Sequence, residues 1–318
     1  MTLRFGIIGA GNIAAKFCSA SRLAKDVEVV AAASRSIARA QRFAAENNVP
    51  AAYGDYCEML EKVDMDAVYV ATTGNFHFEN IMLCLEHHKH VLCEKAMVMT
   101  TAEAEAVFAK ARENNCFVME AMWSCFVPSV QKARQWIAQG LIGPVQIATY
   151  TGGINAPAEH RIYDKSLGGG ALYDLMVYPI EIVSYIVNHP LKNLQSHLRF
   201  GETGVDEMNS LILHFETCDA MLACSTHARI PSPAAFYGPK GYILLHKAHM
   251  ASYCERYDGQ FQLAERFNYP IENGFEFEIA HVRDCILQGR LESEIMPWSS
   301  TLQCVNIFER CFENAHCE

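Results

Sequence analysis

The chain has 318 residues, of which 26 are basic and 36 acidic, for a net charge of -10. This length suits two domains, and a composition of 51% hydrophobic and 19% charged residues is ordinary for a folded soluble protein. An acidic surface repels nucleic acid phosphates and anionic lipids, so we expect neither a nucleic acid nor a membrane as a partner.

Thirteen cysteines are present, and none of them forms a C-x-x-C pair. An odd number without framework spacing in a chain of this length indicates free thiols in a reducing compartment, so we predict a cytoplasmic protein. The histidines near residue 88 do not combine with cysteines at structural zinc spacing, and we expect no metal.

The N-terminus predicts a strand, a glycine turn and a helix. Leu3 to Ile8 is apolar except for Arg4, as in a buried strand, and Gly9, Gly11 and Ala14 fill the spacing G-x-G-x-x-A. Gly9 allows the tight turn, Gly11 lets a pyrophosphate approach the backbone, and the helix N-terminus offers N–H groups to phosphates. The predicted cofactor contacts here are Gly9, Gly11, Asn12 and Ile13. The alternative is a glycine-rich turn without a ligand.

The second predicted strand, Val27 to Ala33, ends at Ser34 and Arg35, with Arg39 one helical turn further on. An NAD site would carry an acidic residue here to bind the ribose 2′-hydroxyl. A guanidinium instead matches a 2′-phosphate in charge and geometry, so the sequence favours NADP over NAD. The alternative is an exposed arginine at a helix start.

Strands and helices then alternate up to residue 120. We expect helices at 37–47, 57–62, 79–86 and 100–114, and strands at 49–53, 66–71, 90–93 and 116–120. This order requires right-handed crossovers and a doubly wound parallel sheet, the Rossmann arrangement. Ligands bind at the carboxyl ends of such strands. Gly9, Ser34, Thr72 and the pair Glu94-Lys95 all fall at those ends, and residues 1–120 form the predicted dinucleotide-binding domain.

Residues 121–318 show a different pattern, with strands separated by turns. We expect strands at 146–150, 195–200, 209–215, 219–225 and 242–246, and helices at 129–139, from the glycine run at 168–170 to about 187, at 275–288 and at 299–312. Helices before and after a run of strands predict an α+β domain with an open, largely antiparallel sheet covered on one face. This domain is predicted to bind the substrate and to form oligomers.

Several motifs carry a family resemblance. These are Gly9 to Ala14, Thr72 to His77, Glu94-Lys95, Glu120-Ala121-Met122-Trp123, and Gly168 to Asp174 followed by Tyr178. With them the chain resembles the glucose-fructose oxidoreductase / inositol dehydrogenase family of NAD(P)-dependent oxidoreductases over almost its whole length. Within that family it is similar to the branch of dimeric dihydrodiol dehydrogenase and NADP-dependent xylose dehydrogenase.

The resemblance implies the catalytic residues. The family's motif lysine, which reaches the substrate hydroxyl or carbonyl, is Lys95 here, and an ammonium stabilises a developing alkoxide. The family's second cluster, an aspartate followed four residues later by histidine or tyrosine, matches Asp174 and Tyr178 on one helix face. Tyr178 would exchange the proton, because a nearby ammonium favours the phenolate, and Asp174 would orient the substrate or hold Lys95.

The remaining assignments also rest on the resemblance. Thr72, Asn75, His77, Glu94 and Lys95 are expected to line the cofactor, with His77 as a structural hydrogen-bonding residue, and Trp123, Arg161 and Tyr163 to line the substrate pocket. Each of four assignments has a structural alternative. Without a role in the site, Glu94-Lys95 would be a surface ion pair and Asp174 would cap its helix. Tyr178 would be an aromatic residue of the core, and Trp123 would be a hinge between the domains.

The chain also departs from the family. Ala96 stands where the motif has proline, Gly74 replaces another proline, Met176 replaces a glycine, and Cys125 replaces an arginine. The predicted function is hydride transfer between NADP(H) and a secondary hydroxyl or carbonyl of a sugar, polyol or cyclic diol. A non-catalytic dinucleotide sensor of the same fold is the alternative. A homodimer or homotetramer is expected, because an open sheet face needs covering.

Overall fold

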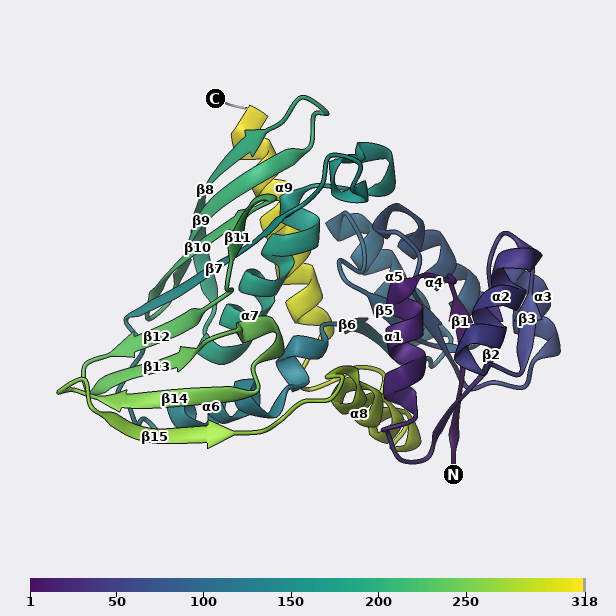
Figure 1. The fold of residues 1–318 in the computed structure, drawn as a ribbon, viewed down its shortest axis with the longest axis horizontal. Coiled ribbons are helices and arrows are strands. Elements are labelled where there is room, and N and C mark those ends of the chain that lie inside the picture. The colour runs from purple at the N-terminus through teal and green to yellow at the C-terminus, as the bar shows by residue number, and fades with distance from the viewer. Residues whose placement is uncertain (317–318) are drawn as a thin grey trace. The chain divides into compact units, whose positions relative to one another are not determined.

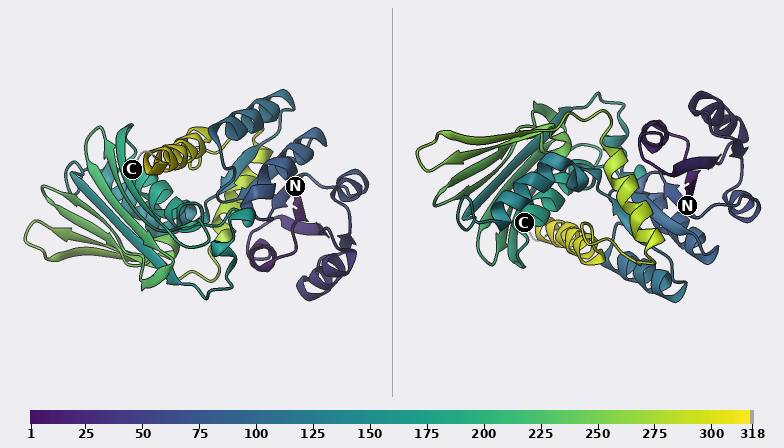
Figure 2. Two further views of the ribbon diagram at one scale, coloured as in Figure 1. Left: turned by 90° about the horizontal axis from the view of Figure 1, so that it is seen from above. Right: turned by 90° about the horizontal axis from the view of Figure 1, so that it is seen from below.

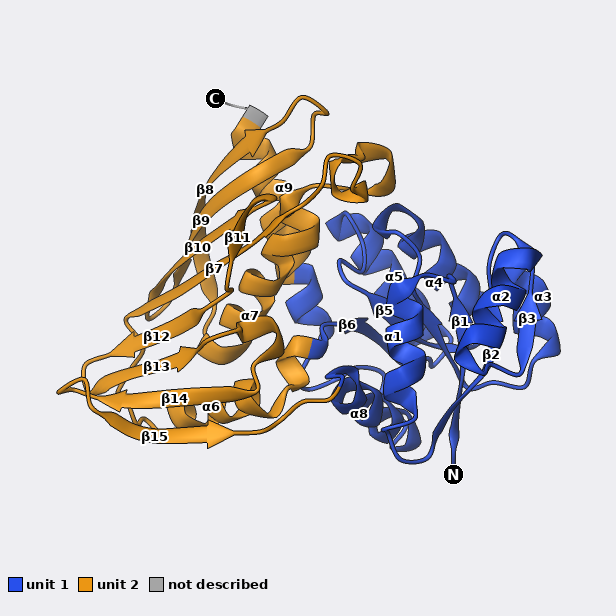
Figure 3. Ribbon diagram, in the orientation of Figure 1, with its two compact units in different colours: residues 1–123, 273–302 blue, residues 124–272, 303–318 orange. Residues whose placement is uncertain are grey.

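The computed structural model describes residues 1–316 and divides into two compact units. The first unit comprises Met1–Trp123 and Asn273–Leu302, and the second comprises Ser124–Glu272 and Gln303–Glu318 (Figures 1 and 3).

The first unit contains a six-stranded parallel sheet in the order β3-β2-β1-β4-β5-β6. Its strands are β1 Leu3–Ile8, β2 Val27–Ala33, β3 Ala51–Tyr53, β4 Ala67–Val70, β5 His90–Glu94 and β6 Val118–Ala121. The helices between them are α1 Asn12–Ser21, α2 Ile37–Asn47, α3 Tyr56–Lys62, α4 His77–Glu86 and α5 Thr101–Glu113. The predicted doubly wound parallel sheet is confirmed.

Local sequence signals place the helix starts in this unit. Asp55 caps α3 by accepting a hydrogen bond from the Glu58 N–H at 2.8 Å. Thr100 and Glu103 form a reciprocal capping box at α5. By contrast, no side chain caps α1 at Gly11, so the first N–H groups of this helix can donate hydrogen bonds to another acceptor.

The second unit contains a largely antiparallel sheet, as predicted, in which only β7 and β10 pair in parallel. The strands are β7 Ile147–Asn155, β8 Leu191–Phe200, β9 Asp206–Phe215, β10 Asp219–Ser225, β11 His227–Ile230, β12 Ala234–Gly238, β13 Gly241–Leu245, β14 Tyr253–Asp258 and β15 Leu263–Asn268. Helices α6 Pro128–Ala138 and α7 Val177–Val187 lie on one face of this sheet (Figure 2).

Four strands of this sheet were not predicted from the sequence: β11, β12, β14 and β15. The sequences of β14 and β15, YCERYD and LAERFN, place charges within the strand and lack a regular alternation of apolar and polar residues. β14 pairs with β13 and β15, its neighbours in the chain, so the absence of period-2 patterning, and not a distant partner, explains why these two strands were not predicted.

The predicted helix before residue 187 starts with an irregular segment. Short 3₁₀ turns at Arg161–Tyr163 and Lys165–Leu167 lead into a π-helical turn, Leu172–Met176, which runs directly into α7. Pro179 lies in the first turn of α7, where it has no N–H to donate, and a wider preceding turn accommodates its ring. The 23-residue stretch Lys165–Val187 is apolar enough to cross a membrane, but 67% of its most apolar window is buried inside the fold, as in a core helix.

The chain returns to the first unit after residue 272, whereas the sequence pattern assigned all of 121–318 to one domain. Helix α8, Phe275–Leu287, packs on α1. Near the start of α9, Trp298–His316, the Trp298 indole donates to the Val118 carbonyl at 2.9 Å and the Thr301 hydroxyl donates to Glu120 at 2.8 Å. Periodicity identifies these helices but does not show which sheet they cover.

Candidate active site

The glycine turn has the features that a dinucleotide needs. Gly9 has a φ of +106°, and a Cβ there would lie 2.6 Å from the Ala71 carbonyl oxygen, so the position is restricted to glycine. A Cβ on Gly11 would meet no atom within 4 Å. The fold itself therefore does not require glycine at Gly11, which is the pattern expected where a ligand approaches the backbone.

Two arginines flank this turn at the end of β2. The Arg39 Nε donates to the Ala10 carbonyl at 3.1 Å, inside the glycine turn. The Arg35 guanidinium lies 4.9 Å from the centre of the Phe76 ring. Ser34 is buried, and its N–H donates to the Tyr53 carbonyl at 3.1 Å. Both arginines are exposed and suited to an anionic group beside the turn.

The loop after β4 contains Thr72, Asn75 and His77. The exposed Asn75 accepts a hydrogen bond from the Thr73 hydroxyl at 2.8 Å, in the 3₁₀ turn Gly74–Phe76. The Asn80 amide donates to the Thr72 hydroxyl at 3.3 Å.

His77 joins this loop to the segment that follows Lys95. Its Nδ1 lies 2.9 Å from the Ala96 carbonyl oxygen and its Nε2 lies 3.0 Å from the Thr72 carbonyl oxygen. Burial, followed by the nearby Lys95 charge, lowers the pKa of His77, although both carbonyl contacts oppose this shift. The ring is therefore neutral at pH 7 and has a single N–H, which it can donate to only one of the two carbonyl oxygens.

Lys95 follows directly after β5, at the carboxyl end of the parallel sheet, and its side chain is half-buried. The Lys95-Ala96 peptide bond is cis. The preceding Glu94 is buried and accepts a hydrogen bond from the Tyr69 hydroxyl. Burial raises the pKa of Glu94, and the Tyr69 hydrogen bond and the Lys95 charge partly offset that effect. Lys95 thus lies in a partly desolvated place with a carboxyl group beside it.

A group of buried charges around Lys16 was missed in the sequence. The Lys16 Nζ lies 4.3 Å from the centres of both the Trp123 and Phe275 rings. Glu278 on α8 is completely buried, and neither carboxyl oxygen has a hydrogen-bond partner among the described residues. Burial, and then the charge of Glu94, raises the pKa of Glu278 well above its usual range. No local motif reveals these contacts, because they join α1 to a helix some 260 positions later in the chain.

Trp123, predicted to line the substrate pocket, is 5% exposed and packs beside Lys16 and Phe275 within the first unit.

In the second unit, the structure brings two predicted site residues together. The Arg161 Nη2 lies 3.0 Å from the Asp174 Oδ1, with the side chains 47% and 13% exposed, respectively. The ion pair places a positive charge beside the Asp174 carboxyl group and leaves much of the Arg161 guanidinium accessible.

Tyr178 lies in the first turn of α7, four residues after Asp174. Its ring centre is 5.9 Å from that of His249, in the 3₁₀ turn Ala248–Met250, and no sequence motif indicates this neighbour. Tyr163 has a different environment. Its hydroxyl lies 3.3 Å from the Thr226 carbonyl oxygen, and its ring stacks on His227.

Asp206 on β9 fixes the start of the π turn that carries Asp174. It is 1% exposed, and its Oδ2 accepts hydrogen bonds from the Leu172 N–H at 2.6 Å and the Asn209 amide at 2.7 Å. Gly170 has a φ of +123°, and a Cβ there would lie 2.3 Å from the Asp206 Oδ1. Burial raises the pKa of Asp206 to about 6. The glycine run is therefore needed for this carboxylate to reach the helix start.

These features define an NAD(P)-dependent oxidoreductase: a Rossmann sheet, a glycine turn with open space at Gly11, and a lysine at the end of β5. Comparison with known families agrees. Residues 3–122 match the oxidoreductase family with an NAD-binding Rossmann fold, and residues 130–244 match the GFO/IDH/MocA C-terminal domain. The chain belongs to the GFO/IDH/MocA family.

The curated relatives agree with the predicted branch. Trans-1,2-dihydrobenzene-1,2-diol dehydrogenase of Xenopus tropicalis is 33% identical, over 98% of this chain and 98% of its own length. The enzyme of the same name from Bos taurus is 31% identical, over 97% of this chain and 96% of its own.

Solved structures show the same fold. A 3-ketoreductase from Actinomadura kijaniata, solved with NADP and TDP-benzene, superposes with a TM-score of 0.89 at 25% identity, over 98% of both chains. An aldose-aldose oxidoreductase from Caulobacter crescentus, solved with glycerol, superposes with a TM-score of 0.91 at 21% identity, over 99% of this chain and 98% of its own. At 21% identity, the similarity to the aldose-aldose oxidoreductase supports the fold only.

Proposed function

We propose that this chain transfers a hydride between NADP(H) and a secondary hydroxyl or carbonyl group of a sugar, polyol or cyclic diol. The observation that carries the proposal is Lys95, half-buried at the carboxyl end of β5, with His77 fixing the backbone after it. The relatives named as diol dehydrogenases support a diol, and the structure solved with NADP and TDP-benzene supports a sugar-like substrate with this cofactor.

The catalytic roles follow from the chemistry of the residues. NADP, when bound, accepts or supplies the hydride. The Lys95 ammonium donates a hydrogen bond to the substrate oxygen and stabilises negative charge that develops there. In the oxidation direction, the Tyr178 phenolate takes the proton of the hydroxyl group, and in reduction the phenol returns it. Asp174, held by Arg161, accepts a hydrogen bond from a neighbouring substrate hydroxyl and fixes its orientation.

Several groups are suited to the cofactor. Gly9, Gly11, Asn12 and Ile13 would face the pyrophosphate, because α1 begins there without a side-chain cap. Arg35 and Arg39 would bind the 2′-phosphate, with Ser34 beside them. Both guanidinium groups are exposed next to the glycine turn, and this supports NADP over NAD.

Oligomerisation through the second sheet is part of the proposal. On the face away from α6 and α7, Ile147, Met221 and Tyr237 are 42%, 46% and 41% exposed. The strand register places Tyr237 opposite Ile147 and Met221 between Ile212 and Thr149, two residues from Ile147 on the same face, so these side chains lie in one strip across β12, β7, β10 and β9. A second copy of the chain would cover such a strip in a homodimer or homotetramer.

The cytoplasm remains the proposed location. The twelve cysteines among residues 1–316 are all free thiols, which supports a reducing compartment.

A turnover screen tests the proposed activity. Purified chain is incubated with NADP or NAD and a panel of sugars, inositols and cyclic diols, and reduced nicotinamide is followed by its absorbance. We expect turnover with NADP and at least one substrate of these classes. No absorbance change with any of them would contradict the proposal.

A further inference from the structure

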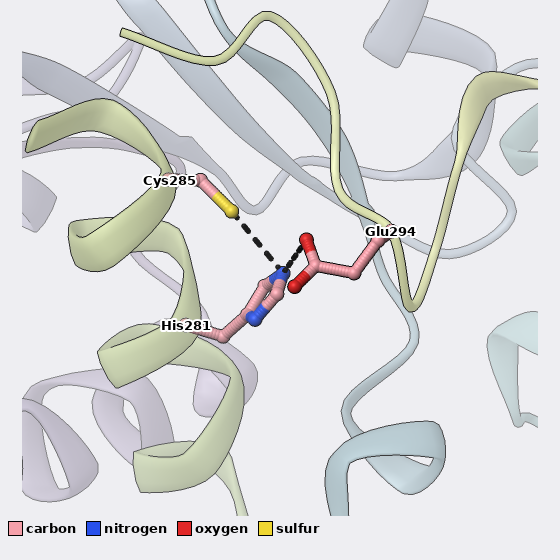
Figure 4. Close-up of side chains that lie close together, drawn as sticks. All are labelled: His281, Cys285 and Glu294. Carbon is pink, nitrogen blue, oxygen red and sulfur yellow. Dashed lines mark hydrogen bonds and ion pairs between the residues drawn. The ribbon is translucent and has the colours of Figure 1, made fainter. Parts of the chain in front are cut away.

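Three metal-ligating side chains converge at the end of α8, within the first unit. His281 and Cys285 are one helical turn apart on α8, and Glu294 comes from the loop that follows (Figure 4). The His281 Nε2 lies 3.3 Å from the Cys285 Sγ and 3.8 Å from the Glu294 Oε2. One ligand atom from each residue lies within 4.8 Å of the other two.

We propose that His281, Cys285 and Glu294 form a binding site for Zn²⁺ or a similar thiophilic divalent cation. Imidazole, thiolate and carboxylate are the usual protein ligands of zinc. The site is independent of the proposed catalytic residues.

The distances suit this chemistry. With zinc bonds of usual length, the 3.3 Å between Sγ and Nε2 gives an S–Zn–N angle of about 100°, close to tetrahedral. The 3.8 Å between Nε2 and Oε2 gives a wider angle of about 140°, so the carboxylate has to move inward by a few tenths of an ångström. The Glu294 side chain is 59% exposed and can make that movement once its ion pair with Arg290 is broken, whereas Cys285 is 2% exposed and packed in place.

The Ser293 hydroxyl competes with a metal for the imidazole. The Ser293 Oγ accepts hydrogen bonds from the Ile295 and Met296 N–H groups and lies 2.7 Å from the His281 Nε2. This nitrogen bonds in a single in-plane direction, so a metal bound there has to displace the contact with Ser293.

Arg290 competes with a cation in this place. Its guanidinium donates to the Glu294 Oε2, the oxygen atom nearest the imidazole. A metal has to displace this ion pair, which is 43% and 59% exposed and correspondingly weak. The arrangement therefore predicts that removal of the arginine charge tightens metal binding.

The test uses the full chain, stripped with a chelator and titrated with Zn²⁺ or Co²⁺ while folding is monitored. We expect one equivalent of Zn²⁺ per chain, a thiolate-to-cobalt charge-transfer band with Co²⁺, and a higher melting temperature with metal. Because a cysteine binds zinc as the thiolate, zinc binding should also release a proton.

Variants distinguish this site from stray binding. Cys285→Ser should abolish the charge-transfer band, and both Cys285→Ser and His281→Gln should weaken zinc binding by about 100-fold or more. Arg290→Gln should strengthen it by about two- to fivefold, the size expected for loss of an exposed ion pair. Cys57→Ser, which removes an exposed thiol, is the control and should change nothing. A cobalt band that persists in Cys285→Ser, or unchanged zinc affinity in His281→Gln or Arg290→Gln, would overturn the proposal.

Discussion

The imidazole of His77 lies 2.9 Å from the carbonyl oxygen of Ala96, the residue that follows Lys95. Its other nitrogen faces the Thr72 carbonyl, so one buried ring links the loops after β4 and β5. These loops contain predicted cofactor residues and the predicted catalytic Lys95, and the ring therefore controls the backbone beside Lys95.

Replacing His77 with leucine should loosen this link. A buried carbonyl then lacks its donor, which should lower the free energy of unfolding by about 1–3 kcal/mol. Turnover should fall further than stability alone explains, because the backbone beside Lys95 is no longer held. Urea unfolding and steady-state kinetics at a temperature where the variant is folded measure both effects. Wild-type values in both would show that the contact is dispensable.

Arg35 and Arg39 should determine the choice of cofactor. Converting both to alanine removes the positive charges proposed for the 2′-phosphate and should lower kcat/KM for NADP by about 10–100-fold. The value for NAD should hardly change. Arg42→Ala, on the exposed side of the same helix, is the matched control. Equal losses with NADP and NAD would assign the arginines a purely structural role.

Asp206 should make stability depend on pH. Its pKa is raised to about 6, so the folded chain binds a proton between about pH 4 and 6 that the unfolded chain does not bind. Its contribution to the free energy of unfolding should therefore decrease as pH rises through this range, by about 3 kcal/mol. Asp206→Asn should remove this part of the pH dependence, while Glu202→Gln at an exposed turn should not. Denaturant unfolding at pH 5 and 7.5 makes the comparison, and parallel pH profiles for wild type and Asp206→Asn would refute it.

Met221 should lie in the contact between subunits. A glutamate there places a charge in the apolar strip of the second sheet and should shift the chain toward monomers, as measured by analytical ultracentrifugation. Leu23→Glu, at an exposed apolar residue outside this sheet, is the control. If wild type is monomeric, or Met221→Glu assembles as wild type does, the sheet is not the interface.

The fold of the first unit was largely readable from the sequence, because each buried parallel strand is a short apolar run that ends at a turn. Gly9 to Ala14 and the strand ends at Ser34, Thr72 and Glu94 therefore fell at one edge of the predicted sheet. The strands β14 and β15 could not be predicted, since their charged sequences lack the alternation that marks a half-buried strand, although β14 pairs with both of its neighbours in the chain.

The contacts of the site residues could not be predicted from the sequence either. Lys16 against Trp123, His249 against Tyr178 and Asp206 at the start of the π turn are all contacts between segments distant in sequence. A pattern with a period of two or 3.6 residues reports which face of an element is buried, but not which side chain it meets. Local motifs located the proposed reacting groups, and only the folded chain shows what orients them.

The central claim concerns Lys95, and a single substitution tests it. In Lys95→Met, kcat for the substrate identified in the turnover screen should fall by about 100–1000-fold, because a charge that stabilises the developing alkoxide is lost. NADPH binding should be retained, and Lys62→Met, at an exposed lysine of α3, should behave as wild type. A Lys95→Met enzyme that turns over at the wild-type rate would contradict the proposed mechanism.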